Sequence, residues 1–340
     1  MLRFFEDFPV GWSDTFGPIS VTKDDIVSFA REYDAQPFHT DEEAAKSTFV
    51  GALIASGWHT CALNMRLVAE GLLLNATSMG APGVEEVKWL IPVRPDDRLR
   101  SRATVTDSRI SKSRPEIGFL LFRFEMLNQR DETVLAQSNW AMFGRRGHPW
   151  PPAPGGGPLP PSTPKVSELP GATPMPFLED MAVGAVSELG SCTFTAEDII
   201  RYAKTFDPQP FHVDPEAAKW SLFGGLCASG WHTAAIWMKQ MIAHRERSWA
   251  ECRRRGEPPP QLGPSPGFKN LKWSKPVYAG DTITYRSQVI ATRPSASRPG
   301  WGLAFHRNSG VNQHGEEVFG FDGAVFWEMR RSLACASSRS

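Results

Sequence analysis

One octapeptide occurs twice in the chain: Asp34-Ala35-Gln36-Pro37-Phe38-His39-Thr40-Asp41 returns 173 residues later as Asp207-Pro208-Gln209-Pro210-Phe211-His212-Val213-Asp214. The same spacing relates Ala55-Ser56-Gly57-Trp58-His59-Thr60 to Ala228-Ser229-Gly230-Trp231-His232-Thr233. A third pair, Lys88-Trp89 and Lys272-Trp273, is 184 residues apart, so the second copy has gained eleven residues before this point. Matched blocks in one order, at so long a period, indicate two copies of one domain.

Length and composition agree with two domains of ordinary size. The chain has 340 residues, of which 41% are hydrophobic and 11% aromatic, as expected of a globular protein. Its 37 Lys and Arg balance 37 Asp and Glu, which argues against a protein that coats nucleic acid. The most apolar stretch, 51–76, is interrupted by charged residues, so we expect a buried helix rather than a membrane span.

The cysteines and the N-terminus bear on the compartment. Five cysteines are scattered along the chain and form neither a disulfide framework nor a zinc pattern. The first residues run directly into Glu6 and Asp7, without the apolar segment of an export signal. We therefore expect a cytoplasmic protein.

The domain boundaries are predicted from proline density. The first domain covers 1–146 and the second 177–331, with a linker at 147–176 and a disordered tail at 332–340. The linker holds eleven prolines and a Gly155-Gly156-Gly157 run, which favours an extended, semi-rigid segment. The tail is short and rich in serine.

Both copies predict the same order of elements. Thr22 and Thr195 each precede an acidic residue by three positions, which is typical of a capped helix start. A long apolar helix is expected from about Gly51, and from about Gly225 in the second copy. Strands with β-branched and aromatic residues follow at 119–126, 134–143 and 317–327. The predicted class is α+β, with an antiparallel sheet around a central helix.

The repeated octapeptide contains an Asp and a His that could do chemistry. Asp34 and His39 are separated by a turn that contains proline, which can bring both side chains to one pocket. Histidine exchanges protons near neutral pH, and a carboxylate can orient it or share a water molecule with it. Such a pair could add water to a polarised double bond, or remove it. Asp207 and His212 repeat the pair, although duplicated core residues would also be retained in both halves.

This motif, followed by a glycine and a serine that open an apolar helix, resembles the MaoC-like (R)-specific enoyl-CoA hydratases and dehydratases. The resemblance covers about residues 5–145 and 177–330. It implies a double hot-dog fold, in which each long helix is wrapped by an antiparallel sheet. It also implies that Asp34 with His39, and Asp207 with His212, hold the water that adds to a 2-enoyl thioester. No cofactor and no metal are expected, because coenzyme A is part of the substrate.

The resemblance extends to four further residues. Gly51 and Gly224 are expected where a helix begins, so that their N–H groups could stabilise an oxyanion; tight packing is the alternative. Ser56 and Ser229 match a family serine near the paired Asp and His, here called the dyad. Packing in a helix is the equal alternative.

The motif also departs from the family pattern. Gln36 and Gln209 stand where the family often has asparagine, and Tyr33 and Phe206 stand where it often has glycine. Eukaryotic double hot-dog relatives keep the dyad in only one half, whereas both are intact here. We therefore expect two sites per chain.

Other residues are given structural interpretations. His59 and His232 are expected in the core or behind the dyad, and Asp41 and Asp214 as helix caps. Aromatic residues of the apolar helices could line an acyl tunnel, but are more often core; they are Trp58, Trp231 and Trp237. The only basic cluster, 244–247 with 253–255, could contact coenzyme A phosphates or form a solvated helix face.

These observations predict a tandem hydro-lyase acting on an acyl-CoA, with the two halves paired as a pseudo-dimer that could assemble further. A hot-dog thioesterase is the alternative enzyme. A non-catalytic acyl-CoA-binding protein is the alternative of another class. Neither nucleic acid nor membrane is an expected partner.

Overall fold

A computed structural model describes residues 2–159 and 171–330 of the chain. The predicted disordered tail at 332–340 lies outside these residues, as does the middle of the predicted linker. Within the described residues, no helix is long and apolar enough to cross a membrane.

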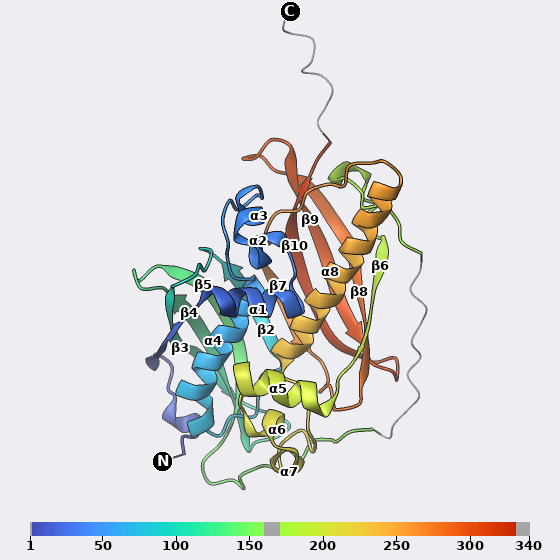
Figure 1. Cartoon of the computed structure of the whole chain (residues 1–340). Coiled ribbons are helices and arrows are strands. Elements are labelled where there is room, and N and C mark those ends of the chain that lie inside the picture. The colour runs from blue at the N-terminus through green and yellow to red at the C-terminus, as the bar shows by residue number, and fades with distance from the viewer. Residues whose placement is uncertain (1, 160–170, 331–340) are drawn as a thin grey trace, which may run out of the picture.

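The strands of both halves form one antiparallel sheet, seen behind the helices in Figure 1. Its order is β1-β3-β4-β5-β2-β7-β10-β9-β8-β6, so each half contributes five strands in an equivalent order. The first half supplies β1 (Ser13–Ser20), β2 (Gly83–Trp89), β3 (Arg98–Ile110), β4 (Ile117–Leu127) and β5 (Thr133–Gly144). The second supplies β6 (Val186–Thr193), β7 (Gly267–Trp273), β8 (Thr282–Pro294), β9 (Trp301–Val311) and β10 (Glu317–Glu328). The strands predicted from sequence are confirmed as β4, β5 and β10.

Strands β2 and β7 form the seam between the halves. They pair antiparallel, with Val84 opposite Leu271 and Val87 opposite Phe268. Glycine is required at both ends of the seam. A Cβ on Gly83 or on Gly267 would lie 2.1 Å from a carbonyl oxygen of the opposing strand. The two sheets therefore join through backbone hydrogen bonds and close approach, as expected for a pseudo-dimer.

The helices also repeat. The first half has α1 (Lys23–Tyr33), α2 (Pro37–Thr40), α3 (Glu42–Lys46) and α4 (Gly57–Gly71). The second half has α5 (Ala196–Phe206), α6 (Pro210–Val213), α7 (Pro215–Lys219) and α8 (Gly230–Arg254). The long helices α4 and α8 lie across the sheet, so the predicted α+β double hot-dog architecture is confirmed (Figure 1).

The predicted helix starts are partly right. Thr22 and Thr195 cap α1 and α5 by accepting hydrogen bonds from the N–H groups of Asp25 and Asp198, both at 3.1 Å. The long helices begin at Gly57 and Gly230 rather than near residues 51 and 225, because Ser56 and Ser229 are their N-caps. The predicted insertion lengthens the second long helix, which has 25 residues against 15 in the first.

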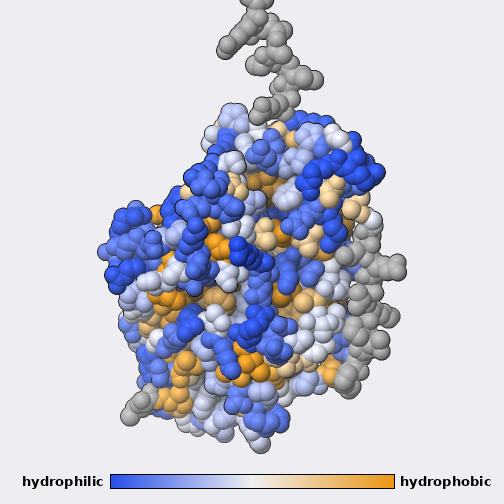
Figure 2. All heavy atoms as spheres, in the orientation of Figure 1, coloured by the Kyte–Doolittle hydropathy of each residue, from blue (hydrophilic) through white to orange (hydrophobic). Residues whose placement is uncertain are grey.

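Apolar side chains fill the space between helices and sheet, while the face seen in Figure 2 is largely hydrophilic with small apolar groups. The histidines of the repeated Gly-Trp-His-Thr segment belong to this core. The ring of His59 stacks on Phe29 with centroids 4.5 Å apart, and His232 stacks on Tyr202 at the same distance. Neither lines a cavity that contains a dyad. The expectation of core histidines is thus met by their positions.

These two histidines predict that the fold is acid-sensitive. Burial lowers the pKa of His59 and of His232 to about 3. Below about pH 6.5 the unfolded chain binds more protons than the folded chain, so stability present at pH 7 is lost as the pH falls. We expect the free energy of unfolding to fall between pH 7 and pH 4 by up to about 3 kcal/mol per histidine.

Urea unfolding at several pH values would measure this effect. His59→Leu should flatten the dependence of the unfolding free energy on pH, whatever it does to stability at pH 7. His314→Gln, at an exposed position, is the matched control and should leave the slope unchanged. If the unfolding free energy of His59→Leu depended on pH as steeply as that of the unaltered protein, buried His59 would not be a source of the acid sensitivity.

Candidate active site

The octapeptide folds as the end of one helix followed by a single turn of another. Asp34 is the C-cap of α1, and its N–H donates to the carbonyl of Ala30 at 2.8 Å. Gln36 is the N-cap of α2, and Pro37 occupies the first turn, where a missing N–H is tolerated. The N–H of His39 then donates to the carbonyl of Gln36 at 2.9 Å. The single turn, which the sequence interpretation described only as a turn, brings the His39 side chain back beside Asp34.

The two side chains face each other without a direct hydrogen bond. His39 Nε2 and Asp34 Oδ2 are 3.5 Å apart, and both residues are 4% exposed. The other ring nitrogen, Nδ1, is 2.8 Å from the carbonyl oxygen of Ile54. A carbonyl oxygen only accepts, so Nδ1 carries a proton. In the neutral ring Nε2 is therefore an acceptor that faces the carboxylate.

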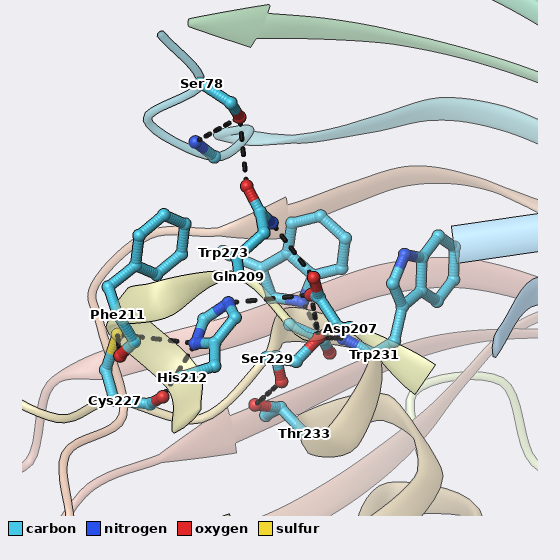
Figure 3. Close-up of polar contacts among 12 residues, drawn as sticks. Ser78, Asp207, Gln209, Phe211, His212, Cys227, Ser229, Trp231, Thr233 and Trp273 are labelled. Carbon is cyan, nitrogen blue, oxygen red and sulfur yellow. Dashed lines mark hydrogen bonds and ion pairs between the residues drawn. The ribbon is translucent and has the colours of Figure 1, made fainter. Parts of the chain in front are cut away.

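The second half repeats this geometry, as Figure 3 shows. His212 Nε2 and Asp207 Oδ2 are again 3.5 Å apart, and His212 Nδ1 donates to the carbonyl oxygen of Cys227 at 2.7 Å. Asp207 and His212 are as buried as their counterparts. The structure thus brings together both predicted pairs.

The predicted serines hold the carboxylates. Ser56 Oγ donates to Asp34 Oδ2 at 2.6 Å, and Ser229 Oγ donates to Asp207 Oδ2 at the same distance. Each serine also caps its long helix, because Trp58 N–H donates to Ser56 Oγ and Trp231 N–H donates to Ser229 Oγ. Both serines are fully buried. Each long helix therefore starts directly at the dyad.

The glutamines complete the environment of the carboxylates. Gln36 Nε2 donates to Asp34 Oδ1 at 2.8 Å, and Gln209 Nε2 donates to Asp207 Oδ1 at 2.9 Å. The longer amide thus still reaches the carboxylate. In the second site Ser78, from the first half, donates to Gln209 Oε1 at 3.0 Å (Figure 3).

Burial lowers the pKa of His39 and of His212, and the facing carboxylate only partly opposes this effect. Both imidazoles are therefore neutral at pH 7. A neutral histidine in this tautomer can accept a proton on Nε2.

Each dyad opens into a cavity whose inner wall belongs to the other half. A cavity of about 720 Å³ contains Asp34 and His39 and continues beneath α8, where Trp237 and Met241 line it. A smaller one, about 290 Å³, contains Asp207 and His212 and continues beneath α4. Of the tryptophans considered above, Trp58 also lines the larger cavity and Trp231 the smaller. The two halves thus form each cavity together: one half supplies the dyad, and the other supplies the wall beneath its long helix.

The placement predicted for Gly51 and Gly224 is wrong. Both lie in turns before the long helices, with φ of +70° and +68°, and neither lines a dyad cavity. Their N–H groups donate within those turns, to the carbonyls of Thr48 and Ser221. They are therefore turn residues, at a conformation that favours glycine.

The residues that do begin the helices were missed. Gly57 lines the larger cavity and Gly230 the smaller, each beside its dyad. The N–H of a first helical residue has no partner within its helix. A Cβ at either position would collide with the indole of Trp89 or Trp273, at 2.5 and 2.2 Å. The sequence did hold a signal for these two glycines, because the Gly-Trp pair and the Lys-Trp pair that packs against it both occur in each half.

The remaining candidates lie away from the dyads. Asp41 and Asp214 cap α3 and α7, as predicted. In the basic insert, Arg254 and Arg255 pair with Glu251 on the surface, whereas Arg245 is buried and lines the larger cavity. No group of three metal-ligating side chains occurs among the described residues.

Comparison with known proteins bears on both halves. The chain is 31% identical over 129 residues to Uncharacterized protein YdeM of Bacillus subtilis (strain 168), which is 38% of this chain and 90% of that protein. A MaoC domain protein from Chloroflexus aurantiacus J-10-fl has a similar structure, with a TM-score of 0.75 at 17% identity over 97% of this chain and 98% of that one. A Mycobacterium tuberculosis protein with a double hotdog fold has a TM-score of 0.67 at 15% identity, over 96% and 98% of the two chains. At such identities the structural likeness shows the fold alone.

The family match is direct. Residues 13–117 and 182–298 each match the family described as MaoC like domain, so the match includes both octapeptides and both helix starts. With more than half of the chain matched in two separate stretches, this protein belongs to the MaoC-like domain family.

Proposed function

We propose that the chain hydrates 2-enoyl thioesters of coenzyme A reversibly, with one reaction centre in each half. The observation that carries the proposal is the gap between His Nε2 and Asp Oδ2, which is 3.5 Å in both halves. Both atoms are acceptors when the histidine is neutral. A water molecule has two protons to donate, so it can bind to both atoms at once.

The held water supplies the nucleophile. As its oxygen bonds to the β-carbon of the enoyl group, one of its protons passes to the dyad and the other stays on the new hydroxyl. The electron pair of the double bond moves toward the thioester, and the α-carbon then takes a proton from the dyad. Water is thus added across the double bond with no other reactant, and the reverse path removes it.

The start of each long helix supports this charge movement. An enolate-like charge develops on the thioester oxygen and needs donors already in place. The N–H groups of Gly57 and Gly230 are free of helical partners, and the positive end of the helix dipole lies with them. We assign the oxyanion role to these glycines in place of Gly51 and Gly224.

The two cavities favour acyl groups of different size. The first dyad faces about 720 Å³ and the second about 290 Å³. In the smaller cavity Phe122 and Phe124 take up space beneath α4. Long or bulky acyl chains therefore fit the Asp34 site, and both sites can take short ones.

Single variants would assign the chemistry. Asp34→Asn should reduce hydration of a long enoyl-CoA by ~10²–10⁴-fold, because a neutral amide cannot take a proton from the water. It should leave a share of crotonyl-CoA hydration, carried out by Asp207. Asp207→Asn should keep the long-chain activity, and the double variant should lose both. Loss of the conjugated absorbance measures each rate.

Asp24→Asn, at an exposed position of α1, is the control and should behave as the unaltered protein. Release of free thiol should be followed in parallel, since a thioesterase would give that signal instead. Full activity in the folded double variant would show that the dyads are not the reaction centres.

The acid limb of the rate profile is also predicted. The reaction needs neutral His39 or His212, whose pKa values burial lowers. As the pH falls, the active form, with a neutral imidazole, therefore persists below pH 6.5, which is the ordinary pKa of histidine. We expect kcat/KM for crotonyl-CoA to stay level from pH 8 to pH 6.5 and to fall only at lower pH. A midpoint at or above 6.5, in protein shown by circular dichroism to be folded, would contradict this assignment.

A further inference from the structure

Four positions of the second half that line the larger cavity carry polar residues, whereas the equivalent positions of the first half carry apolar residues. Arg245 lies within α8, 15 residues after Gly230, and its counterpart Leu72, 15 residues after Gly57, is the C-cap of the shorter helix α4. The pairing of Ala103 with Phe124 in one sheet matches that of Ser287 with Asn308 in the other. By this register, the second-half residues and their first-half counterparts are Arg245 for Leu72, Ser287 for Ala103, His306 for Phe122, and Asn308 for Phe124. All four polar residues line the larger cavity.

Arg245 is the most unusual of the four. It is 7% exposed, and within residues 2–159 and 171–330 it has neither a hydrogen bond nor an ion pair. Its Nε is wholly buried without a partner. An unpaired buried cation is destabilising, and the first half folds with leucine at this position. The arginine therefore has a role other than holding the fold together.

The charge is present at physiological pH. Burial lowers the pKa of Arg245 to about 10, and the Asp34 carboxylate partly opposes this effect. Arg245 thus stays protonated at pH 7 and makes the cavity positive on one wall. The cavity also contains Asp180, but that carboxylate accepts a hydrogen bond from Arg330.

Arg245 is not needed to hold the Asp34 and His39 side chains in position. No Arg245 nitrogen lies within ion-pair distance of Asp34. In the second site the position equivalent to Arg245 is Leu72, yet Asp207 and His212 keep the same 3.5 Å separation. The dyad geometry therefore forms without a buried cation nearby.

Its neighbours are equally suited to a ligand. His306 Nδ1 lies 3.2 Å from Ser287 Oγ, while its Nε2 is buried without a partner, as is Asn308 Oδ1. Burial and the Arg245 charge lower the pKa of His306 to about 4, so its ring is neutral at pH 7. When Nδ1 accepts from Ser287, Nε2 is a donor. The imidazole Nε2–H can then donate to a group that Arg245 binds, and Asn308 can donate to that group through Nδ2, because its Oδ1 only accepts.

The position of the arginine identifies which part of the substrate it meets. Coenzyme A phosphates lie at the far end of the pantetheine arm from the thioester. Arg245 instead lines the same cavity as Asp34, on the wall that α8 contributes, and is near enough to Asp34 for their charges to interact. The acyl group occupies this region when the thioester lies at the dyad.

We propose that the Asp34 site takes an acyl group carrying its own carboxylate, bound by Arg245 beside His306, Ser287 and Asn308. The substrate class is the 2-enoyl-CoA of a dicarboxylic acid. A guanidinium binds a carboxylate through two parallel hydrogen bonds, which suits an arginine that the protein leaves unpaired. This inference rests on the proposed hydration at Asp34 and names its substrate.

The test compares acyl chains that differ only in the terminal group. In an Asp207→Asn background, kcat/KM is measured for 2-hexenedioyl-CoA and 2-hexenoyl-CoA, and for longer and shorter pairs. The diacid should be preferred at the length that reaches Arg245. Arg245→Leu should lower the ratio of diacid to monoacid kcat/KM by ~100-fold or more, and Arg245→Lys by less. Arg253→Gln, exposed on the same helix, should leave the ratio unchanged.

Stability and binding separate the possible failures. Arg245→Leu should unfold at a temperature no lower than the unaltered protein, because leucine replaces an unpaired cation. Calorimetry should show that saturated adipoyl-CoA binds more tightly than hexanoyl-CoA, and that Arg245→Leu removes the difference. Equal losses for both acyl classes would overturn the proposal and leave hydration intact. Carboxylate-selective binding without hydration of any enoyl-CoA would instead overturn the proposed function.

Discussion

The pairing of β2 with β7 is the constraint from which the sites follow. It joins two five-stranded sheets edge to edge and sets α4 and α8 side by side across them. Each dyad, on the helices before its own long helix, then lies against the hollow of the other half. A hot-dog unit of this chain has a dyad and a hollow, but the two meet only across the seam. The close approach at Gly83 and Gly267 is therefore also a condition for both sites.

Within each half, one hydroxyl connects the long helix to the dyad. Ser56 accepts from the backbone of the long helix and donates to the Asp34 carboxylate, and Ser229 repeats both contacts. The helix start thus fixes the carboxylate, and the single turn of α2 or α6 fixes the histidine beside it. This short chain of contacts explains how two sites with different surroundings keep the same dyad distances.

Much of this was predictable from the sequence. The repeated octapeptide indicated both dyads, the capping threonines indicated the first helices, and the eleven-residue offset appears as the longer α8. Gly51 was misplaced because an apolar run shows where a helix is buried rather than where its first hydrogen bond forms. Arg245 was expected with the surface arginines around it, since helix periodicity cannot reveal a polar wall contributed by strands far along the chain. The sharing of each cavity between halves likewise depends on pairing that no local pattern encodes.

The crossed cavities also bear on how such a chain can evolve. The first copy carries the dyad of the larger cavity, and the second copy carries the wall that, in the proposed function, would contact the acyl group. The opposite holds for the smaller cavity. Under the proposed function, substitutions in the wall of one copy would therefore change which acyl groups reach the other copy's dyad, while that dyad itself stays unchanged. Because both copies are in one chain, the two cavity walls can acquire different substitutions. In a dimer of identical subunits, every substitution would change both walls in the same way.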